Sequence, residues 1–148
     1  MNEADLQQYL DAHIPPSRAL GVRVEEVGTE RVRLSAPLEP NLNHRQTAFG
    51  GSVASLAVLA GWSWLHARLA AHQPVPALVV QQQTVEYLAP IDDAFEAICV
   101  APSAAAWQRF DRALSSRGRG RLELTAEVRC RGRCAATFRG LYVAVAAD

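Results

Sequence analysis

The chain has 148 residues, of which 49% are hydrophobic and 20% charged, and its formal net charge at pH 7 is zero. This length and composition are typical of one globular domain, so we expect a single domain over residues 1–148. The absence of net charge gives no support to a nucleic-acid or membrane partner. Three cysteines, Cys99, Cys130 and Cys134, have no CxxC spacing. This pattern indicates free thiols, and we expect no metal and no cofactor.

Targeting signals are missing from the N-terminal segment, which is acidic and amphipathic. It lacks the basic start and apolar core of a signal peptide. The longest apolar run, Val53–Leu65, is too short to span a bilayer. We therefore expect a cytoplasmic protein.

The first half of the chain predicts two helices around one hairpin. Residues 3–13 carry apolar side chains at helical spacing and precede Pro15 and Pro16, which end a helix. Residues 20–27 and 31–38 alternate between apolar and polar around a short turn, as strands of a hairpin do. After a polar loop, a long helix is expected from Ser52 to about Ala70, with no charged residue before His66.

The second half predicts strands and one further helix. Residues 76–90 form a strong strand pattern, and residues 93–102 are expected to be its antiparallel neighbour. Residues 103–118 have the pattern of a shorter amphipathic helix. Residues 120–130 and 134–146 then close the chain as a hairpin, so the expected order is α-ββ-α-ββ-α-ββ.

The long helix decides the fold class, because a helix that is hydrophobic all round is buried all round. One such helix among about six antiparallel strands must be wrapped by the sheet, and its small residues let the strands approach closely. We therefore expect an α+β hotdog fold, in which a curved antiparallel sheet surrounds one central helix. The strand at 77–88 would leave a long exposed edge in a monomer, which favours a homodimer or a dimer of dimers.

Two glycines, Gly50 and Gly51, stand immediately before the predicted helix. A helix start has unpaired backbone N–H groups and a partial positive charge. Glycine would let a carbonyl oxygen approach those groups and form an oxyanion hole. The structural alternative is that the pair only permits a tight turn and close helix packing.

The residues around these glycines resemble those of hotdog-fold acyl-thioester enzymes. The resemblance is narrower to the thioesterase domain that occurs alone or behind an acetyltransferase domain in proteobacteria. It is carried by IPPSRALGVRV (14–24), APLEPNLNHRQTAFGGSVASLAVLAGW (36–62), QQQTVEYLAP (81–90) and the C-terminal ATFRGLYVA. The resemblance implies a homodimer with sites at its interface and a substrate on the pantetheine arm of coenzyme A or acyl carrier protein.

The chain departs from many hotdog thioesterases at two positions. These enzymes have a His immediately before the Gly pair and an acid on the central helix, whereas Phe49 stands at the first position here and residues 52–65 contain no acid. The candidate catalytic residues are Asn43, His44, Gly50 and Gly51, with Thr47, Phe49 and Ser52 as substrate-binding candidates beside them. His44 is the available general base, and a loop-fixing hydrogen bond is its alternative role. Asn41 is expected to shape the turn.

The strand after the helix adds three more substrate-binding candidates. Strict alternation places Val79, Gln81, Gln83, Val85 and Tyr87 on one face, so Gln81, Gln83 and Tyr87 can reach a site at the dimer interface. A structural ladder of amides is the alternative for the two glutamines. Alternation points Glu86 to the opposite face.

The basic residues are unevenly distributed, with nine Arg against three acids between residues 109 and 139. This segment is either a solvated strand face or a surface for the phosphates of coenzyme A or for an acidic carrier protein.

Three functions remain open from the sequence. The first is hydrolysis of an acyl thioester of coenzyme A or acyl carrier protein. The second, which the missing carboxylate favours, is decarboxylation of malonyl-acyl carrier protein to the acetyl thioester in fatty-acid initiation. The third is a non-catalytic module that binds acyl thioesters.

Overall fold

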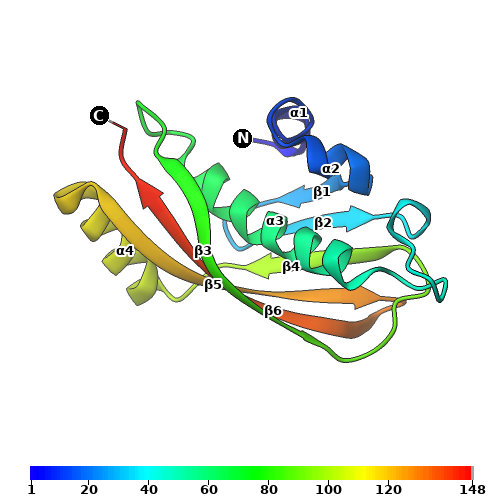
Figure 1. The fold of residues 1–148 in the computed structure, drawn as a ribbon. Helices are drawn as coiled ribbons and strands as arrows, with labels where there is room; N and C mark the ends of the chain where they lie inside the picture. The colour runs from blue at the N-terminus through cyan, green and yellow to red at the C-terminus, as the bar shows by residue number, and fades with distance from the viewer. Residues whose placement is uncertain (148) are drawn as a thin grey trace.

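The computed structural model describes residues 1–147 and shows six antiparallel strands curved around one long helix (Figure 1). The elements in chain order are α1 (Glu3–His13), α2 (Pro15–Leu20), β1 (Arg23–Val27), β2 (Arg31–Ala36), η1 (Glu39–Asn41), α3 (Gly50–Leu69), β3 (Ala77–Tyr87), β4 (Phe95–Val100), α4 (Ala104–Arg117), β5 (Arg119–Cys130) and β6 (Arg133–Val145). This arrangement confirms the predicted hotdog fold.

The N-terminal residues form two consecutive helices where one was predicted. The first ends at His13 as expected, but Pro15 and Pro16 then stand in the first turn of α2. Proline is favoured there because its fixed φ suits a helix and its missing N–H needs no partner. The helix α2 ends at Gly21, whose φ of 73° lies in the left-handed region that glycine adopts readily.

The strand order in the sheet is β1-β2-β4-β5-β6-β3, and all neighbouring strands are antiparallel. The β1–β2 and β5–β6 hairpins are confirmed. The prediction that β4 is the neighbour of β3 is wrong, because β3 pairs with β6 and β4 lies between β2 and β5. Sequence order suggests a hairpin wherever two strands follow one another, but the chain here crosses the sheet between β3 and β4. The strand β3 is therefore left at the edge.

The helix α3 supplies the centre of the core. Leu56, Ala57, Ala60 and Leu65 on this helix are completely buried. Gly61 allows the closest contact, because an added Cβ would lie 2.8 Å from Cζ of Tyr142, a buried residue on β6. The hydroxyl of Tyr142 donates a hydrogen bond of 2.6 Å to the carbonyl of Val58 and so ties the sheet to the helix.

One stripe of α3 is not covered by its own chain. Gly51 and Ser55 are exposed, and Val58 and Trp62, which follow at helical spacing, are half-buried. The expectation of burial on every side therefore holds for this chain except along this stripe. The stripe adjoins β3, since the indole N–H of Trp62 donates to the carbonyl of Leu78 at 3.2 Å.

Candidate active site

The start of α3 presents two unpaired backbone donors. Phe49 is the N-cap residue and its side chain makes no capping hydrogen bond. The carbonyl of Phe49 accepts from the amides of Ser52 and Val53, at 2.9 and 3.1 Å. Within the described chain, the amides of Gly50 and Gly51 donate to no acceptor. The positive end of a 20-residue helix is thus available to a negative charge.

Both glycines have aromatic neighbours, and the contact is closer at Gly51 than at Gly50. A Cβ on Gly51 would lie 2.9 Å from Cζ of Phe49, because the Phe49 ring folds back over the glycine. A Cβ on Gly50 would lie 3.4 Å from the Tyr87 ring and hydroxyl, which is a tight but ordinary contact. The Tyr87 hydroxyl donates to the Gly50 carbonyl at 2.8 Å and fixes the end of β3 beside the helix start.

A pocket of about 390 Å³ opens at this helix start. Its lining residues come from the loop before α3, the first turn of α3, the end of β3 and the segment after it: Asn43, Thr47, Ala48, Gly50, Val53, Tyr87, Leu88, Ala89, Pro90 and Ile91. No carboxylate and no imidazole is among them. The pocket therefore combines backbone donors with a mostly apolar wall and lacks a strong proton acceptor.

The loop between η1 and α3 is held by the side chain of Asn43. Its Oδ1 accepts from the backbone amides of Arg45 and Thr47, at 2.8 and 3.2 Å. Its Nδ2 donates to Oγ1 of Thr47 at 2.9 Å and to the carbonyl of Ala48 at 3.4 Å. An amide side chain has two donor hydrogens and two acceptor sites, so all four positions of Asn43 are used inside the loop.

These bonds stabilise an unusual backbone conformation. Gln46 has φ of 63°, a left-handed conformation that residues other than glycine rarely adopt. The ends of the loop are fixed separately, because the Ala48 amide donates to the Ile91 carbonyl at 2.8 Å and the Phe49 amide to the Asn41 carbonyl at 2.7 Å. Asn43 thus sets the shape of the loop that delivers the helix start.

Comparison with known proteins assigns the chain to a family. A family model described as "Putative thioesterase (yiiD_Cterm)" matches residues 3–146. This chain belongs to that thioesterase family. Membership supports thioesterase activity in general terms.

Solved structures agree with this family assignment. A protein of unknown function from Chlorobaculum tepidum TLS is 28% identical, with 98% of this chain and 94% of that chain covered and a TM-score of 0.91. A protein described as a putative thioesterase from Shewanella oneidensis is 29% identical, with 97% and 96% covered and a TM-score of 0.82. A Pseudomonas aeruginosa protein described as a probable thioesterase shares the fold at 20% identity, with 97% and 96% covered and a TM-score of 0.80.

The other loop candidates lie at different depths in this thioesterase-family chain. His44 is exposed at the loop surface and does not line the pocket. Asn41 is 2% exposed, and its Nδ2 donates to the carbonyls of Leu20 and Pro37 at 2.9 and 2.8 Å, which agrees with the expected role in shaping the turn. Ser52 is buried in the first turn of α3.

The face assignment along β3 needs a correction. The pairing of β3 with β6 shifts between Val80 and Gln82, so Gln81 is an extra residue in a β-bulge. The prediction that Val79 and Gln81 share a face with Gln83 is therefore wrong. Gln83 and Tyr87 lie opposite buried residues of β6 and face α3. A bulge reverses the alternation, and the run of polar and β-branched residues from 79 to 85 gives no signal of it.

Sequence analysis missed the segment from Leu88 to Ile91, which forms one wall of the pocket. Its only local signal is Pro90, which marks the end of the strand. The amides of Leu88 and Ala89 donate to the carbonyl of Ala135 on β6, at 2.8 and 3.2 Å. That long-range pairing, which is not readable from the segment itself, carries the segment past the helix start.

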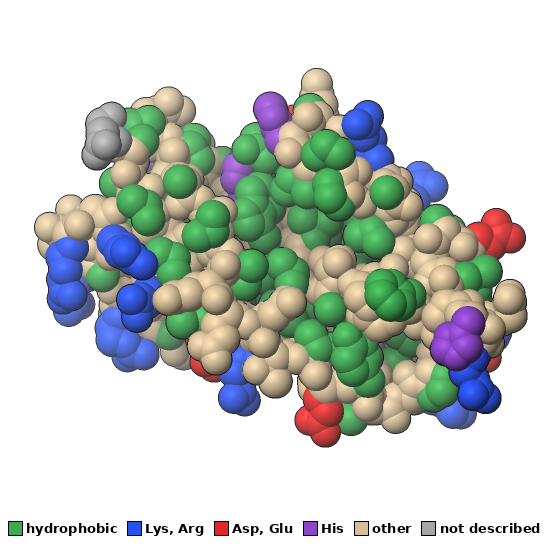
Figure 2. Space-filling view, in the orientation of Figure 1, with side chains coloured by type: hydrophobic (Ala, Val, Ile, Leu, Met, Phe, Trp, Pro, Cys, Tyr) green, Lys and Arg blue, Asp and Glu red, His purple; other side chains and the backbone are tan. Residues whose placement is uncertain are grey.

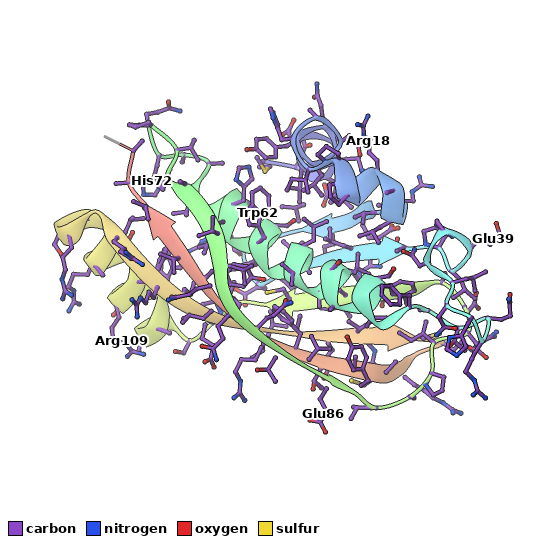
Figure 3. The ribbon with its side chains drawn as sticks, in the orientation of Figure 1. Arg18, Glu39, Trp62, His72, Glu86 and Arg109 are labelled. Atoms are coloured by element: carbon purple, nitrogen blue, oxygen red, sulfur yellow. The ribbon has the colours of Figure 1, made fainter. Side chains whose placement is uncertain are left out.

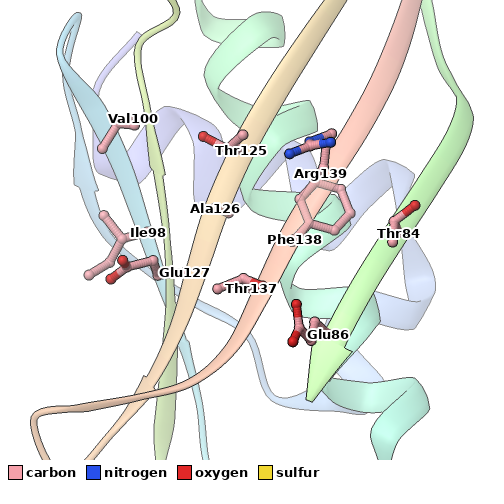
Figure 4. Close-up of a pocket in the computed structure, with 10 residues that line it drawn as sticks. All are labelled: Thr84, Glu86, Ile98, Val100, Thr125, Ala126, Glu127, Thr137, Phe138 and Arg139. Carbon is pink, nitrogen blue, oxygen red and sulfur yellow. The ribbon is translucent and has the colours of Figure 1, made fainter. Parts of the chain in front are cut away.

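A second hollow, of about 480 Å³, lies on the face of the sheet turned away from α3 (Figure 4). Thr84, Glu86, Glu127 and Arg139 are among its lining residues. Glu86 points to this outer face, as alternation predicted, and Figure 3 shows it directed away from the helix. The hollow lies on the opposite face of the sheet from the start of α3.

Among residues 1–147, no three His, Cys, Asp or Glu side chains are grouped so that they could hold a metal ion. In the same part of the chain, no helix has the length and apolar character needed to cross a membrane.

Proposed function

We propose that this chain acts on acyl thioesters carried on a pantetheine arm of coenzyme A or acyl carrier protein, with hydrolysis as the reaction. The observation that carries this proposal is the pair of unpaired amides at Gly50, which lines the pocket, and at Gly51, the exposed residue that follows it. In hydrolysis, water adds to the thioester carbonyl, negative charge develops on the carbonyl oxygen, and the thiolate then leaves and takes up a proton. Donors placed at that oxygen lower the barrier, and one such donor is worth about 3 kcal/mol.

The wall of the pocket suits the remainder of the substrate. Val53, Leu88 and Ile91 offer apolar surface to an acyl chain, and the half-buried stripe of α3 continues that surface toward Trp62. The exposed ring of Phe49 stands immediately before the helix start, at the position where many hotdog thioesterases have a His. Gln83, on the face of β3 toward α3, is an available hydrogen-bond partner for the amides of the pantetheine arm.

Decarboxylation of malonyl-acyl carrier protein is a second candidate, and the absence of a carboxylate or imidazole from the pocket favours it. The C–C bond to the carboxylate breaks, its electron pair forms the thioester enolate, and CO₂ leaves. The enolate carbon then takes a proton and gives the acetyl thioester. This reaction needs stabilisation of the enolate oxygen by the same two amides but no base to activate water.

The assembly proposed with this function is a homodimer or a dimer of dimers that pairs β3 edge to edge. In the described chain, β3 has a hydrogen-bonded neighbour only on its β6 side, although it is 11 residues long. Val79 is 58% exposed and Val80 is 38% exposed. An unpaired, partly apolar edge of this length is covered in stable proteins. Light scattering should therefore give at least twice the chain mass of 16.1 kDa, and a monomer would contradict the proposal.

Product analysis by mass spectrometry tests the reaction itself. Acyl and malonyl thioesters of coenzyme A and of acyl carrier protein are incubated with the protein. Free acid and thiol support hydrolysis, acetyl thioester supports decarboxylation, and tight binding without any product supports a non-catalytic binding module.

A matched pair of variants isolates the amide of Gly50. Gly50→Ala and Gly50→Pro place the same Cβ beside Tyr87, but only proline removes the N–H. Proline is favoured at the first helical position, and Phe49 already has the extended conformation, φ −60° and ψ 131°, that a residue before proline needs. We expect turnover of Gly50→Pro to be about 10²-fold below that of Gly50→Ala, with both variants folded. Equal turnover of the two would show that this amide does not bind the reacting oxygen.

A further inference from the structure

Five arginines without acidic partners form one surface of the molecule. Arg109, Arg112 and Arg117 are on α4, and Arg119 and Arg121 are on β5. All five are exposed, and none makes an ion pair within residues 1–147. We call these five residues the arginine surface. It lies over α4 at the left of Figure 2, where blue side chains gather.

This concentration is not a general property of the chain. Across the outer face of the sheet, arginines are paired with acids. Arg33 lies 3.1 Å from Glu96, Arg129 lies 3.0 Å from Glu127, and Arg139 lies 3.5 Å from Glu123. Between residues 109 and 121 the five arginines are accompanied by one acid, Asp111. The unneutralised positive charge therefore belongs to α4 and the start of β5.

The arginine surface is concave and is built on rigid elements. Arg109, Arg117, Arg119 and Arg121 line a hollow of about 690 Å³, in which Glu123 is the one acid. The helix α4 is seated firmly on the sheet, because a Cβ on Gly120 would lie 2.8 Å from the ring of Phe110. Four arginines thus line one fixed hollow, and guanidinium groups carry forked donors suited to carboxylates or phosphates.

We propose that the arginine surface is the docking site for an acidic carrier protein that delivers the thioester. This inference rests on the proposed function, since the carrier brings the substrate of the Gly50 and Gly51 site. The spread of charge over a helix and a strand matches the carboxylates of a protein face. The hollow offers a nucleotide base no exposed ring on which to stack, because Phe110, the one aromatic residue in it, is only 1% exposed.

The position of the arginine surface determines which site it serves. It lies at the C-terminal end of α3, where Arg68 is 4.6 Å from the Trp107 ring of α4. Gly50 is at the other end of this 20-residue helix, about 30 Å away. Figure 3 shows Arg109 and Glu39, which is near the site loop, at opposite ends of the molecule. An extended pantetheine arm is shorter than this separation, so the surface cannot serve the site of its own chain.

The proposed dimer resolves this separation. Ala77 at the start of β3 lies opposite Val145, which lies opposite Arg119. When two β3 edges pair antiparallel, the start of one strand lies beside the end of the other, where Tyr87 contacts the helix start. Arg119 is then three strand spacings, about 14 Å, from the partner's β3. A carrier bound to one protomer therefore delivers its thioester to the partner's site.

The test compares two triple variants of the full-length protein. R117Q/R119Q/R121Q removes charge from the arginine surface, and R18Q/R23Q/R133Q removes three exposed arginines elsewhere that also lack acidic partners. We expect the first variant to bind phosphopantetheinylated acyl carrier protein at least about tenfold more weakly and to raise KM for its thioester to the same degree. The kcat of the first variant, and its turnover of a pantetheine thioester without carrier, should equal those of the parent protein. The control variant should equal the parent protein in all of these measurements.

The outcomes separate this proposal from the proposed function. Carrier binding is measured without turnover, so equal affinity of the parent and the first triple variant overturns the docking site whether or not any thioester reacts. A loss for coenzyme A thioesters as large as the loss for the carrier would overturn the choice of a protein partner. If the parent protein turns over no thioester but the first triple variant binds the carrier more weakly than the parent, the docking site is supported and the proposed reaction is wrong.

Mixed dimers test delivery between protomers. One protomer carries R117Q/R119Q/R121Q with an intact helix start, and the other carries Gly50→Pro with intact arginines. Delivery to the partner predicts about half the parental turnover of carrier-linked thioester, since one complete pair of surface and site remains. Delivery within one chain predicts turnover no higher than that of the triple variant alone, and this result would overturn the inference.

Discussion

Replacing Asn43 by alanine removes the side chain that shapes the loop before α3. The Asn43 side chain makes four hydrogen bonds, all to residues of its own loop. The bonds of the loop ends, from Ala48 to Ile91 and from Phe49 to Asn41, do not involve this side chain. The substitution should therefore loosen the loop locally while the core and the global unfolding transition change little.

The size of the effect follows from these contacts. Three of the bonds are between 2.8 and 3.2 Å, and the fourth, at 3.4 Å, is weak. Each good bond is worth about 1 kcal/mol net, and partial exposure lets water replace some of it, so we take about 2 kcal/mol for the loop. Opening of the loop then becomes about 30-fold more frequent. Turnover should fall between about 10-fold and 100-fold, because a loop without these bonds no longer holds the helix start in the exact geometry that the reacting carbonyl needs.

Hydrogen exchange and turnover are measured on the same variants. The amides of Arg45 and Thr47, which donate to Asn43 Oδ1, should exchange about 30-fold faster in Asn43→Ala. Asn43→Asp keeps an acceptor for both amides, so it should recover most of the protection and lose less than about tenfold in turnover. His44→Ala is the control, since His44 is exposed and lies outside the pocket lining.

Three results would refute this reasoning. Turnover of Asn43→Ala within about twofold of the parent would mean that loop shape does not matter for the reaction. If Asn43→Asp loses as much as Asn43→Ala while its amides stay protected, then Nδ2 acts on the substrate directly. A large loss of activity in His44→Ala would make His44 the general base.

Three further predictions concern the core and its titrating groups. Gly61→Ala should lower the free energy of unfolding, measured by denaturant titration, by about 3 kcal/mol, because the added Cβ displaces the Tyr142 ring and breaks its hydrogen bond to Val58. A change below about 1 kcal/mol would contradict the packing described. Burial, with a smaller contribution from a nearby histidine, lowers the pKa of His66, so the unfolded chain binds a proton at a higher pH than the folded chain. The melting temperature should therefore decrease as the pH is lowered from 7.5 to about 5.5, and the decrease should be smaller in His66→Phe. Burial raises the pKa of Cys99 to about 12, so iodoacetamide at neutral pH should label Cys134 before Cys99 in the folded protein and both equally after denaturation.

Much of the fold could be predicted from local patterns. The absence of charge at the start of α3 identified a central helix, and alternation identified the strands of both hairpins. The helix was predicted from Ser52 but begins at Gly50, because glycine has low helix propensity and gives no local signal of a first helical turn. Strand order could not be predicted, since packing around α3 determines which strands pair with β3 and β4.

The candidate site was located by the glycine pair, but the roles of its polar residues were not readable from sequence. The amide side chain of Asn43 suits a catalytic role, but its hydrogen bonds are those of a residue that supports the loop. Only the distances in the structure distinguish these two roles. The β-bulge at Gln81 reversed the predicted face of the strand start. The wall from Leu88 to Ile91 arises from a long-range pairing with β6, which local sequence does not encode.

The central claim is that the amides of Gly50 and Gly51 bind the thioester oxygen. Selective ¹⁵N labelling of the nine glycines gives a simple amide spectrum in which these two signals can be followed. The protein is titrated with a ketone analogue in which a methylene group replaces the thioester sulfur. We expect the Gly50 and Gly51 amide protons to move downfield with a common binding constant, while the signal of exposed Gly132 in the β5–β6 turn stays in place. Binding of the analogue with both amide signals unmoved would contradict this claim.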